Sequence, residues 1–256
     1  MKLMENLTEF TVHAVDGKPE RRVVDVKAVC LGRAASRDID AMEKMVEEKR
    51  SAGFAVYRPP NVCRKSRYLL TNEGEIEVQE RRTSSEGEYV AIMDRGDVLV
   101  SVGSDVNDST LLELESSALG KVFDTAKSKQ ACPAVVARDA WLYSEVKDHW
   151  DELRLRTSVV ISRKKVTYQD FPLSNLVDLG FYLKRFPWLK KNGTVLLSGS
   201  SAAVPDVPKK LFDPAAKDGI FPDNFHLELH DPLLDRTITH TYAVRHLEWP
   251  DSDVSP

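Results

Sequence analysis

The sequence predicts a β-dominated α+β fold, and three observations support this class. Runs of alternating or β-branched residues, typical of strands, occur at about eight or more places, against about four segments with helical spacing. The two kinds of segment do not alternate as they do in parallel βαβ proteins. Apolar residues make up 42% of the chain and charged residues 30%, the ordinary composition of a globular protein. The 256 residues fit a single domain, 1–256, in which residues 1–22 form an N-terminal extension or an edge strand.

One amphipathic helix is predicted within residues 37–53. Apolar side chains recur there at helical spacing, at Ile39, Met42 and Val46. Asp38 is expected to cap the N-terminus of this helix, and Gly53 to end it. A proline-broken extended segment follows at residues 57–72.

A β-hairpin is predicted at the centre of the chain. Residues 87–93 and 98–102 are both strand-like, and the polar sequence Asp94-Arg95-Gly96-Asp97 lies between them. If Arg95 and Gly96 form a two-residue turn, Asp94 faces Asp97 across the hairpin. The same register places Glu86 opposite Asp105.

The remaining segments add strands and two further helices. Strands are predicted at residues 23–31, 75–79, 158–162, 166–169, 194–197, 225–229 and 237–248, and helices at residues 110–123 and 174–186. Residues 203–224 are rich in Pro, Lys and Asp, and we expect them to form a mobile loop, because loops of this length are usually mobile or functional.

Charge and cysteine content narrow the classes of function. The net charge of −4 and the pI of about 5.9 give no electrostatic reason to expect binding to nucleic acid or to an anionic membrane. Cys30, Cys63 and Cys132 have no metal-binding spacing, and their odd number favours reduced thiols. No apolar run approaches the roughly 18 residues of a membrane span. We therefore expect a soluble cytoplasmic protein.

Three carboxylates cluster near the base of the predicted hairpin. Glu86 and Glu88 are two residues apart and so point to the same face of their strand, with Asp105 opposite Glu86. Directly opposed residues have Cβ atoms about 5 Å apart, so the carboxylates repel one another unless a cation or protons neutralise them. Oxygen ligands suit Mg²⁺, Mn²⁺ or Ca²⁺ better than Zn²⁺.

The same spacing also fits an exposed strand end whose acidic side chains face solvent. A four-residue loop between the strands would shift the register and separate Glu86 from Asp105. Spacing alone leaves both interpretations open.

Five segments, in order, resemble motifs of the fumarylacetoacetate hydrolase superfamily, most closely its short, uncharacterised prokaryote-type branch. The resemblance covers residues 23–247. VCLGRAASRD (29–38) resembles the entry to the active-site lid, TSSEGEYVAI (83–92) the Glu-x-Glu metal motif, and VGSDVND (102–108) the Gly-x-Asp motif. SKQACP (128–133) is similar to the lysine-then-Cys-Pro segment, and LLSGSSAAV (196–204) stands where relatives have a strand ending in Gly-Thr-Pro or similar.

The resemblance implies a fold, a cofactor and a set of site residues. The fold would be a mixed β-roll of stacked sheets with a few peripheral helices, often dimeric, so we expect a homodimer. The metal ligands would be Glu86, Glu88 and Asp105, holding Mg²⁺ (or Mn²⁺ or Ca²⁺). The remaining implied residues contact the substrate: Lys129, or Lys127 with a small shift, faces its carboxylate or enolate, and Ser200, Ser201 and Asp108 help to bind it.

The sequence departs from the family at positions where relatives carry a proton-transferring histidine and an arginine. Hydrolytic relatives carry a lid-helix histidine, expected here near Met45, and the branch usually has Asp-His-Thr-Asp-Arg where this chain has residues 105–109, DVNDS. Glu47 and Glu48 of the predicted lid helix are alternative bases, although they also fit a solvated helix face. His226, His230 and His240 are predicted to be structural. All six histidines lie outside the five motifs: His13, His149, His226, His230, His240 and His246.

The function implied by the resemblance is a Mg²⁺-dependent enzyme acting on a small oxo acid or 1,3-dicarbonyl compound through a metal-stabilised enolate. The reaction would be C–C bond hydrolysis, decarboxylation or tautomerisation, and the missing histidine counts against hydrolysis, which needs an activated water. A biosynthetic cyclase or isomerase, or a non-catalytic binding protein on the same fold, are the alternatives.

Overall fold

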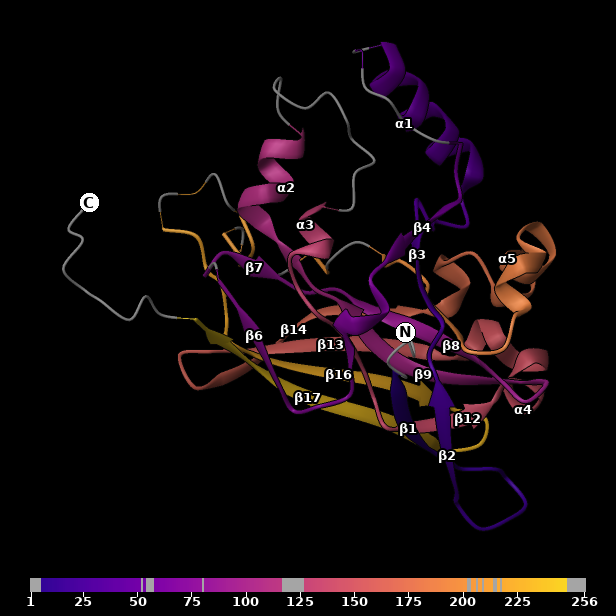
Figure 1. Ribbon diagram of the computed structural model, residues 1–256. Helices are drawn as coiled ribbons and strands as arrows, with labels where there is room; N and C mark the ends of the chain where they lie inside the picture. The colour runs from indigo at the N-terminus through magenta and orange to yellow at the C-terminus, as the bar shows by residue number, and fades with distance from the viewer. Residues whose placement is uncertain are drawn as a thin grey trace, which may run out of the picture.

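Two β-sheets packed face to face form the body of the computed structural model (Figure 1). The structure describes residues 6–51, 53, 58–79, 81–116, 127–201, 204–205, 207–208, 210–213, 216 and 218–247. Strands dominate these residues, as the sequence predicts, and helices α1 and α2 stand on the same side of the two sheets (Figure 1).

The first sheet is mixed and has ten strands within the described residues. Its main path runs in the order β2 (Glu20–Asp25), β1 (Leu7–Val12), β12 (Asp139–Leu142), β9 (Asp97–Asp105), β8 (Gly87–Asp94), β15 (Thr194–Leu197), β3 (Ala28–Arg33) and β4 (Asn61–Lys65). The short strand β11 (Ala134–Val136) joins β9 to β5 (Leu70–Thr71).

The second sheet has five strands in the described part of the chain. Their order is β14 (Lys164–Pro172), β13 (Arg154–Ile161), β16 (Asn224–Asp231), β17 (Arg236–His246) and β6 (Glu75–Val78). A separate short pair joins β10 (Asn107–Asp108) to β7 (Thr83–Ser84).

The helices are short and peripheral. They are α1 (Ile39–Ser51), α2 (Ser109–Ser116), α3 (Lys127–Gln130), α4 (Tyr143–Val146) and α5 (Leu179–Arg185), with 3₁₀ turns at Arg67–Leu69, Lys147–Glu152, Leu173–Asn175 and Pro187–Lys190. Helix α1 matches the predicted helix: Asp38 Oδ1 accepts a hydrogen bond from the backbone N–H of Ala41 at 3.0 Å, and Gly53 has a φ of +87°.

Two other helix predictions differ from the structure. The helix predicted at residues 174–186 begins later, at Leu179, because Asp178 stays extended and its carboxylate caps the N–H of Phe181 at 2.9 Å. Helix α2 occupies the first part of the segment predicted at 110–123, and residues 117–123 lie outside the described residues. The loop predicted at residues 203–224 is only partly described.

The hairpin of β8 and β9 has the predicted register. Gly87 pairs with Ser104, and Asp94 pairs with Asp97 at the turn. Arg95 and Gly96 have φ angles of +52° and +90°. A two-residue turn with both φ angles positive matches the right-handed twist of the strands it joins, so the local sequence fixes the pairing.

Both faces of this hairpin are buried. Tyr89 and Val100 belong to one apolar cluster, which includes Leu227 and Leu229 of the second sheet. Val90 and Leu99 belong to a second cluster on the opposite face, with residues of the N-terminal strands. Because apolar clusters cover both of their faces, β8 and β9 form the central layer of the fold. Full burial of each large aliphatic side chain there contributes about 1.5–3 kcal/mol.

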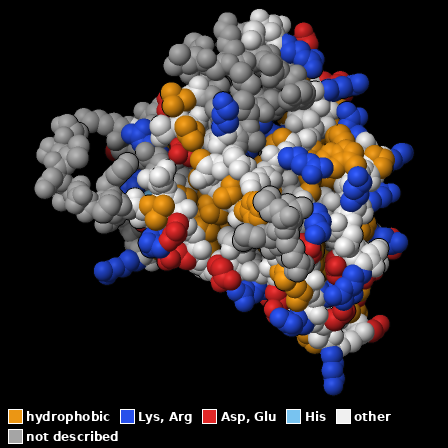
Figure 2. Space-filling model, viewed as in Figure 1, with side chains coloured by type: hydrophobic (Ala, Val, Ile, Leu, Met, Phe, Trp, Pro, Cys, Tyr) orange, Lys and Arg blue, Asp and Glu red, His pale blue; other side chains and the backbone are white. Residues whose placement is uncertain are grey.

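The surface seen in Figure 2 carries basic and acidic side chains interspersed over the same face, with apolar side chains between them. Exposed large apolar residues include Leu7, Tyr68 and Leu233. None of the helices in the described ranges combines the length and the apolar character that crossing a membrane requires.

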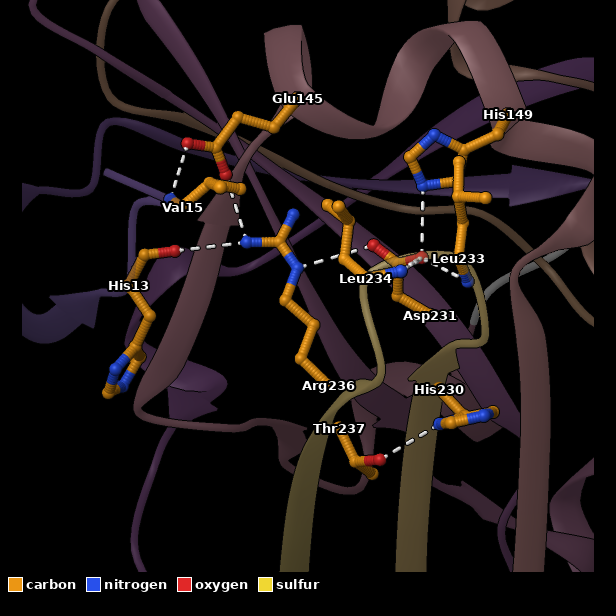
Figure 3. A network of polar contacts seen from close by, with 10 residues as sticks. All are labelled: His13, Val15, Glu145, His149, His230, Asp231, Leu233, Leu234, Arg236 and Thr237. Atoms are coloured by element: carbon orange, nitrogen blue, oxygen red, sulfur yellow. Dashed lines mark hydrogen bonds and ion pairs between the residues drawn. The ribbon is translucent and has the colours of Figure 1, made fainter. Parts of the chain in front are cut away.

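Arg236, at the start of β17, ties the second sheet to the N-terminal strand (Figure 3). Its guanidinium donates to the backbone oxygen of His13 at 3.3 Å, to Glu145 Oε2 at 2.9 Å and to Asp231 Oδ2 at 3.2 Å. Asp231 is fully buried and also pairs with His149 Nε2 at 3.0 Å. Burial alone would raise the pKa of Asp231, but these donors outweigh burial and lower it. The contacts therefore stabilise the fold above the unfolded-state pKa, and this contribution is lost as the pH falls.

Replacing Arg236 with methionine is expected to lower the free energy of unfolding by about 3–5 kcal/mol, because the buried Asp231 and the half-buried Glu145 lose their shared guanidinium partner. Urea unfolding measures the change. Arg21→Met is the matched control: Arg21 forms an ion pair with Glu9 in solvent, which screens the interaction, so this variant should unfold almost like the unaltered protein. Equal losses in the two variants would contradict the account.

Candidate active site

A cavity of about 490 Å³ opens beside the first residues of β8. Glu86, Glu88 and Lys129 form its charged end, and the loop Gly199–Ser201 borders them. Met42 and Met45 of helix α1 line another part of the wall. The cavity thus joins the predicted metal motif, the predicted lysine and the predicted lid helix.

Glu88 is buried at the charged end. Only 1% of the residue is exposed, and its Oε2 accepts a hydrogen bond from the backbone N–H of Gly199 at 2.8 Å. Burial raises the pKa of Glu88 to about 8, although the charge of Lys129 opposes this shift. The carboxyl therefore carries a proton near neutral pH unless a further positive charge approaches it. Glu86, by contrast, is exposed.

Asp105 lies at the end of β9 and is held by two lysines. Its Oδ1 is 2.9 Å from Lys65 Nζ, and its Oδ2 is 2.6 Å from Lys129 Nζ. Burial would raise the pKa of Asp105, but the two ammonium groups lower it. For Lys129, burial is outweighed by the attraction of Asp105 and Glu88, so its pKa is raised and the ammonium stays charged.

Sequence reasoning missed Lys65. It is the last residue of β4, its side chain is fully buried, and burial lowers its pKa against the opposing attraction of Asp105. It belongs to the predicted proline-broken segment, where its neighbours Arg64 and Ser66 are also polar. No periodicity or motif therefore distinguished it as a buried cation.

The three predicted metal ligands are not arranged alike. Glu86 and Glu88 line the cavity, whereas Asp105 does not and is reached through Lys129. Within the described residues, no three His, Cys, Asp or Glu side chains converge so that they could hold a metal ion as they stand. Both carboxylate oxygens of Asp105 are bonded to lysines.

The end of β3 and the loop that follows β15 meet backbone to backbone at the cavity. Strands β3 and β15 are parallel neighbours, so the loops that follow them leave the same edge of the sheet. A Cβ atom on Gly32 would lie 2.4 Å from the backbone oxygen of Ser198, and one on Gly199 would lie 2.8 Å from that of Gly32. Glycine at both positions permits this close approach, which places the N–H of Gly199 on Glu88.

The other predicted residues take different places. Ser200 and Ser201 line the cavity, but the Ser200 hydroxyl already donates to the backbone oxygen of Gly87 at 2.9 Å. Asp108 caps helix α2 by accepting from the N–H of Leu111 at 2.9 Å. The structure places Lys129, and not the exposed Lys127, at the cavity.

Helix α1 presents apolar side chains to the cavity. Met42, Met45 and Val46 line it, while Glu47 and Glu48 are exposed and do not. The geometry therefore gives no support for either glutamate as a base. Because methionine is flexible and polarizable, this wall can adapt to different apolar shapes.

Residues 34–242 match the family described as "Protein of unknown function (DUF2848)". The chain belongs to this family. No curated protein matches its sequence.

Several solved structures have a similar fold. The chain resembles 2-keto-3-deoxy-D-arabinonate dehydratase with a TM-score of 0.59 and 16% identity, covering 92% of this chain and 79% of that one. Cg1458 gives a TM-score of 0.51 and 14% identity over 90% and 85% of the two chains. The yeast fumarylacetoacetate hydrolase family protein ynq8 gives a TM-score of 0.50 and 10% identity, covering 88% of this chain and 95% of that one. At these identities the likeness shows the fold alone, and the predicted fold of stacked mixed sheets is confirmed.

Gly87, between Glu86 and Glu88, has no room for a side chain. A Cβ atom there would lie 2.0 Å from Thr157 Oγ1 and 2.7 Å from Leu155 Cδ2. The segment that carries both glutamates is therefore pressed against β13 of the second sheet.

Gly87→Ala is expected to destabilise the protein by about 1–3 kcal/mol, because overpacking forces the backbone or its neighbours to move. Thermal and urea unfolding measure this loss. Gly74→Ala is the control, since the nearest atom to its added Cβ, the backbone oxygen of Thr241, is 3.8 Å away. A Gly87→Ala variant as stable as Gly74→Ala would show that the two sheets do not confine this segment.

Proposed function

We propose that this protein is a Mg²⁺-dependent enzyme that acts on a small oxo acid or 1,3-dicarbonyl compound. The observation that carries the proposal is the charged end of the cavity, where Lys129 lies beside Glu86 and the buried Glu88. The fold adds support, because one solved structure that shares it is named a dehydratase of a 2-keto acid. The proposal includes a cytoplasmic homodimer, as the sequence motifs and the reduced cysteines suggest.

The carboxylates suit a hard divalent cation. Glu86 and Glu88 supply oxygen atoms at the cavity wall, and Asp105 would complete the set by exchanging its contact with Lys129 for the ion. Burial raises the pKa of Glu88, and a cation bound beside it would favour the charged carboxylate. When bound, Mg²⁺ supplies Lewis-acid polarisation of a substrate carbonyl oxygen.

Lys129 would bind and orient the substrate. Its ammonium stays charged, reaches the cavity and is mostly shielded from water, with 17% of the side chain exposed. A fixed positive charge in such a place attracts a substrate carboxylate and stabilises negative charge that develops on a carbonyl oxygen. The backbone of the Gly199–Ser201 loop borders the same region.

The cavity favours reactions that do not depend on a histidine base. Among the described residues that line it there is no histidine, which agrees with the histidine missing from the lid helix. Decarboxylation or tautomerisation therefore fits better than C–C bond hydrolysis. The apolar wall formed by Met42, Met45 and Val46 keeps a cyclase or isomerase acting on a less polar substrate as the second candidate.

Mg²⁺ binding at pH 7 is expected to release about one proton, because the ion replaces the proton that Glu88 holds below its pKa of about 8. Calorimetric titration in two buffers with different ionisation enthalpies measures the release. The buffer dependence should disappear at about pH 9, where Glu88 is ionised in the metal-free protein.

Glu86→Ala and Glu88→Gln should weaken Mg²⁺ binding at least tenfold. Glu113→Gln, an exposed change on helix α2, is the matched control and should bind Mg²⁺ normally. Unchanged binding in Glu86→Ala, or heats independent of buffer at pH 7, would count against the proposed metal site.

Lys129→Met should weaken binding of oxalate, a small mimic of a chelating enolate, at least tenfold in the presence of saturating Mg²⁺, because the fixed positive charge is lost. Lys127→Met removes an exposed charge two residues away and serves as the control. Competition binding or calorimetry measures both affinities. Similar losses in both variants would mean that Lys129 acts only through the net charge of the protein.

A further inference from the structure

Gln169 is a buried amide in β14 that belongs to none of the motifs in the sequence. Only 2% of the residue is exposed, and it comes from the second sheet, whereas Glu88 lies in β8 of the first sheet and Glu86 immediately before that strand. A buried side-chain amide that lacks partners is costly, so its contacts indicate what holds it there.

The contacts of Gln169 form a closed ring of hydrogen bonds. The backbone N–H of Gly87 donates to Gln169 Oε1 at 2.8 Å, and Gln169 Nε2 donates to Ser200 Oγ at 2.6 Å. The Ser200 hydroxyl then donates to the backbone oxygen of Gly87 at 2.9 Å. Gln169 Nε2 also donates to the backbone oxygen of Ser201 at 2.9 Å. Only a side chain with both an acceptor and a donor can close this ring, which suits Gln rather than Glu or Met.

A bulge in β14 aims Gln169 at this place. Thr157 pairs with Gln169 but Ser158 pairs with Thr167, so Tyr168 is an extra residue in the ladder. In a regular strand the side chains of Tyr168 and Gln169 would point to opposite faces. The bulge lets both buried side chains reach the same segment, at Ser85 and Gly87. The Tyr168 hydroxyl donates to the backbone oxygen of Ser85 at 2.6 Å.

The second sheet therefore holds the chain on both sides of Glu86. Tyr168 anchors Ser85, and Gln169 anchors Gly87. The same amide holds Ser200, whose neighbour Gly199 donates its backbone N–H to Glu88. Two cavity segments from distant parts of the sequence are thus fixed to one side chain.

We propose that Gln169 is a positioning residue that fixes the Glu86–Glu88 segment and the Gly199–Ser201 loop in one arrangement, on which Mg²⁺ affinity depends. This inference rests on the proposed function, because Mg²⁺ binding is its readout. Residues that support metal ligands through hydrogen bonds typically change metal affinity by about 10–100-fold when replaced. Gln169 would act through the segment it holds and not by touching the ion.

The test compares Mg²⁺ dissociation constants, measured by calorimetry well below each variant's melting temperature. Gln169→Met keeps similar length but removes the amide, and its Mg²⁺ dissociation constant should rise about tenfold. Ser200→Ala removes one member of the ring and should raise it about threefold or more. Because the residues act as one unit, the double variant should bind no more than about twofold more weakly than Gln169→Met alone. Thr167→Val is the control, since Thr167 lies in the same strand as Gln169 and its hydrogen bond goes to Ser158 of β13 and not to Gly87. This variant should bind Mg²⁺ within about twofold of the unaltered protein.

A folded Gln169→Met variant with Mg²⁺ affinity within about twofold of the unaltered protein would overturn the inference and leave the proposed function standing. A loss of the same size in Thr167→Val would also overturn it, since a general disturbance of β14 would then explain the effect. If Gln169→Met does not fold, Ser200→Ala decides: a threefold or larger loss supports the inference, and a smaller one overturns it. An unaltered protein that binds no Mg²⁺ overturns the proposed function and this inference together.

Discussion

Asp105 shares its carboxylate between Lys65 and Lys129, and this buried arrangement connects the fold to the candidate site. A buried charge is tolerated only when it is paired and hydrogen-bonded. The three residues come from the end of β9, the end of β4 and helix α3, so their pairing brings three separate segments together. It also fixes the Lys129 ammonium at the cavity beside the buried Glu88. The same contacts that satisfy buried charges therefore place Lys129 beside two carboxylates that line the cavity.

The walls of the cavity depend on how the two sheets pack. Gly87 is pressed against β13, and Gln169 of β14 holds its backbone, so the second sheet determines where Glu86 and Glu88 lie. The parallel pairing of β3 and β15 brings Gly32, near the end of β3, against Gly199 in the loop after β15. Helix α1 adds an apolar wall from a segment that begins immediately after one of these loops.

Local sequence predicted the parts of the site that depend on local geometry. The turn at Arg95-Gly96 determines the hairpin register, and the ordered motifs predicted Glu86, Glu88 and Lys129, which the structure brings to one cavity. Lys65 and Gln169 were missed because their roles depend on tertiary structure: one is a polar residue among polar neighbours, and the other is aimed by a β-bulge with no signal in a single sequence. The predicted start of α5, at residue 174, is too early, because apolar residues at helical spacing also occur before the capping residue Asp178. Their place on helix α1 makes Glu47 and Glu48 candidate bases in the sequence, but the apolar side of that helix faces the cavity.

The central claim is that Glu86, Glu88 and Asp105, with Lys129 beside them, form a site for a hard divalent cation and a chelating oxo acid. A crystal structure of the protein soaked with Mg²⁺ and oxalate tests this most directly. The expected result is an ion bound through oxygen atoms of Glu86, Glu88 and Asp105 at about 2.0–2.1 Å, with oxalate on the ion and within hydrogen-bond distance of Lys129. A cavity without either at saturating concentrations, or an ion held elsewhere while Lys129 stays on Asp105, would contradict the account.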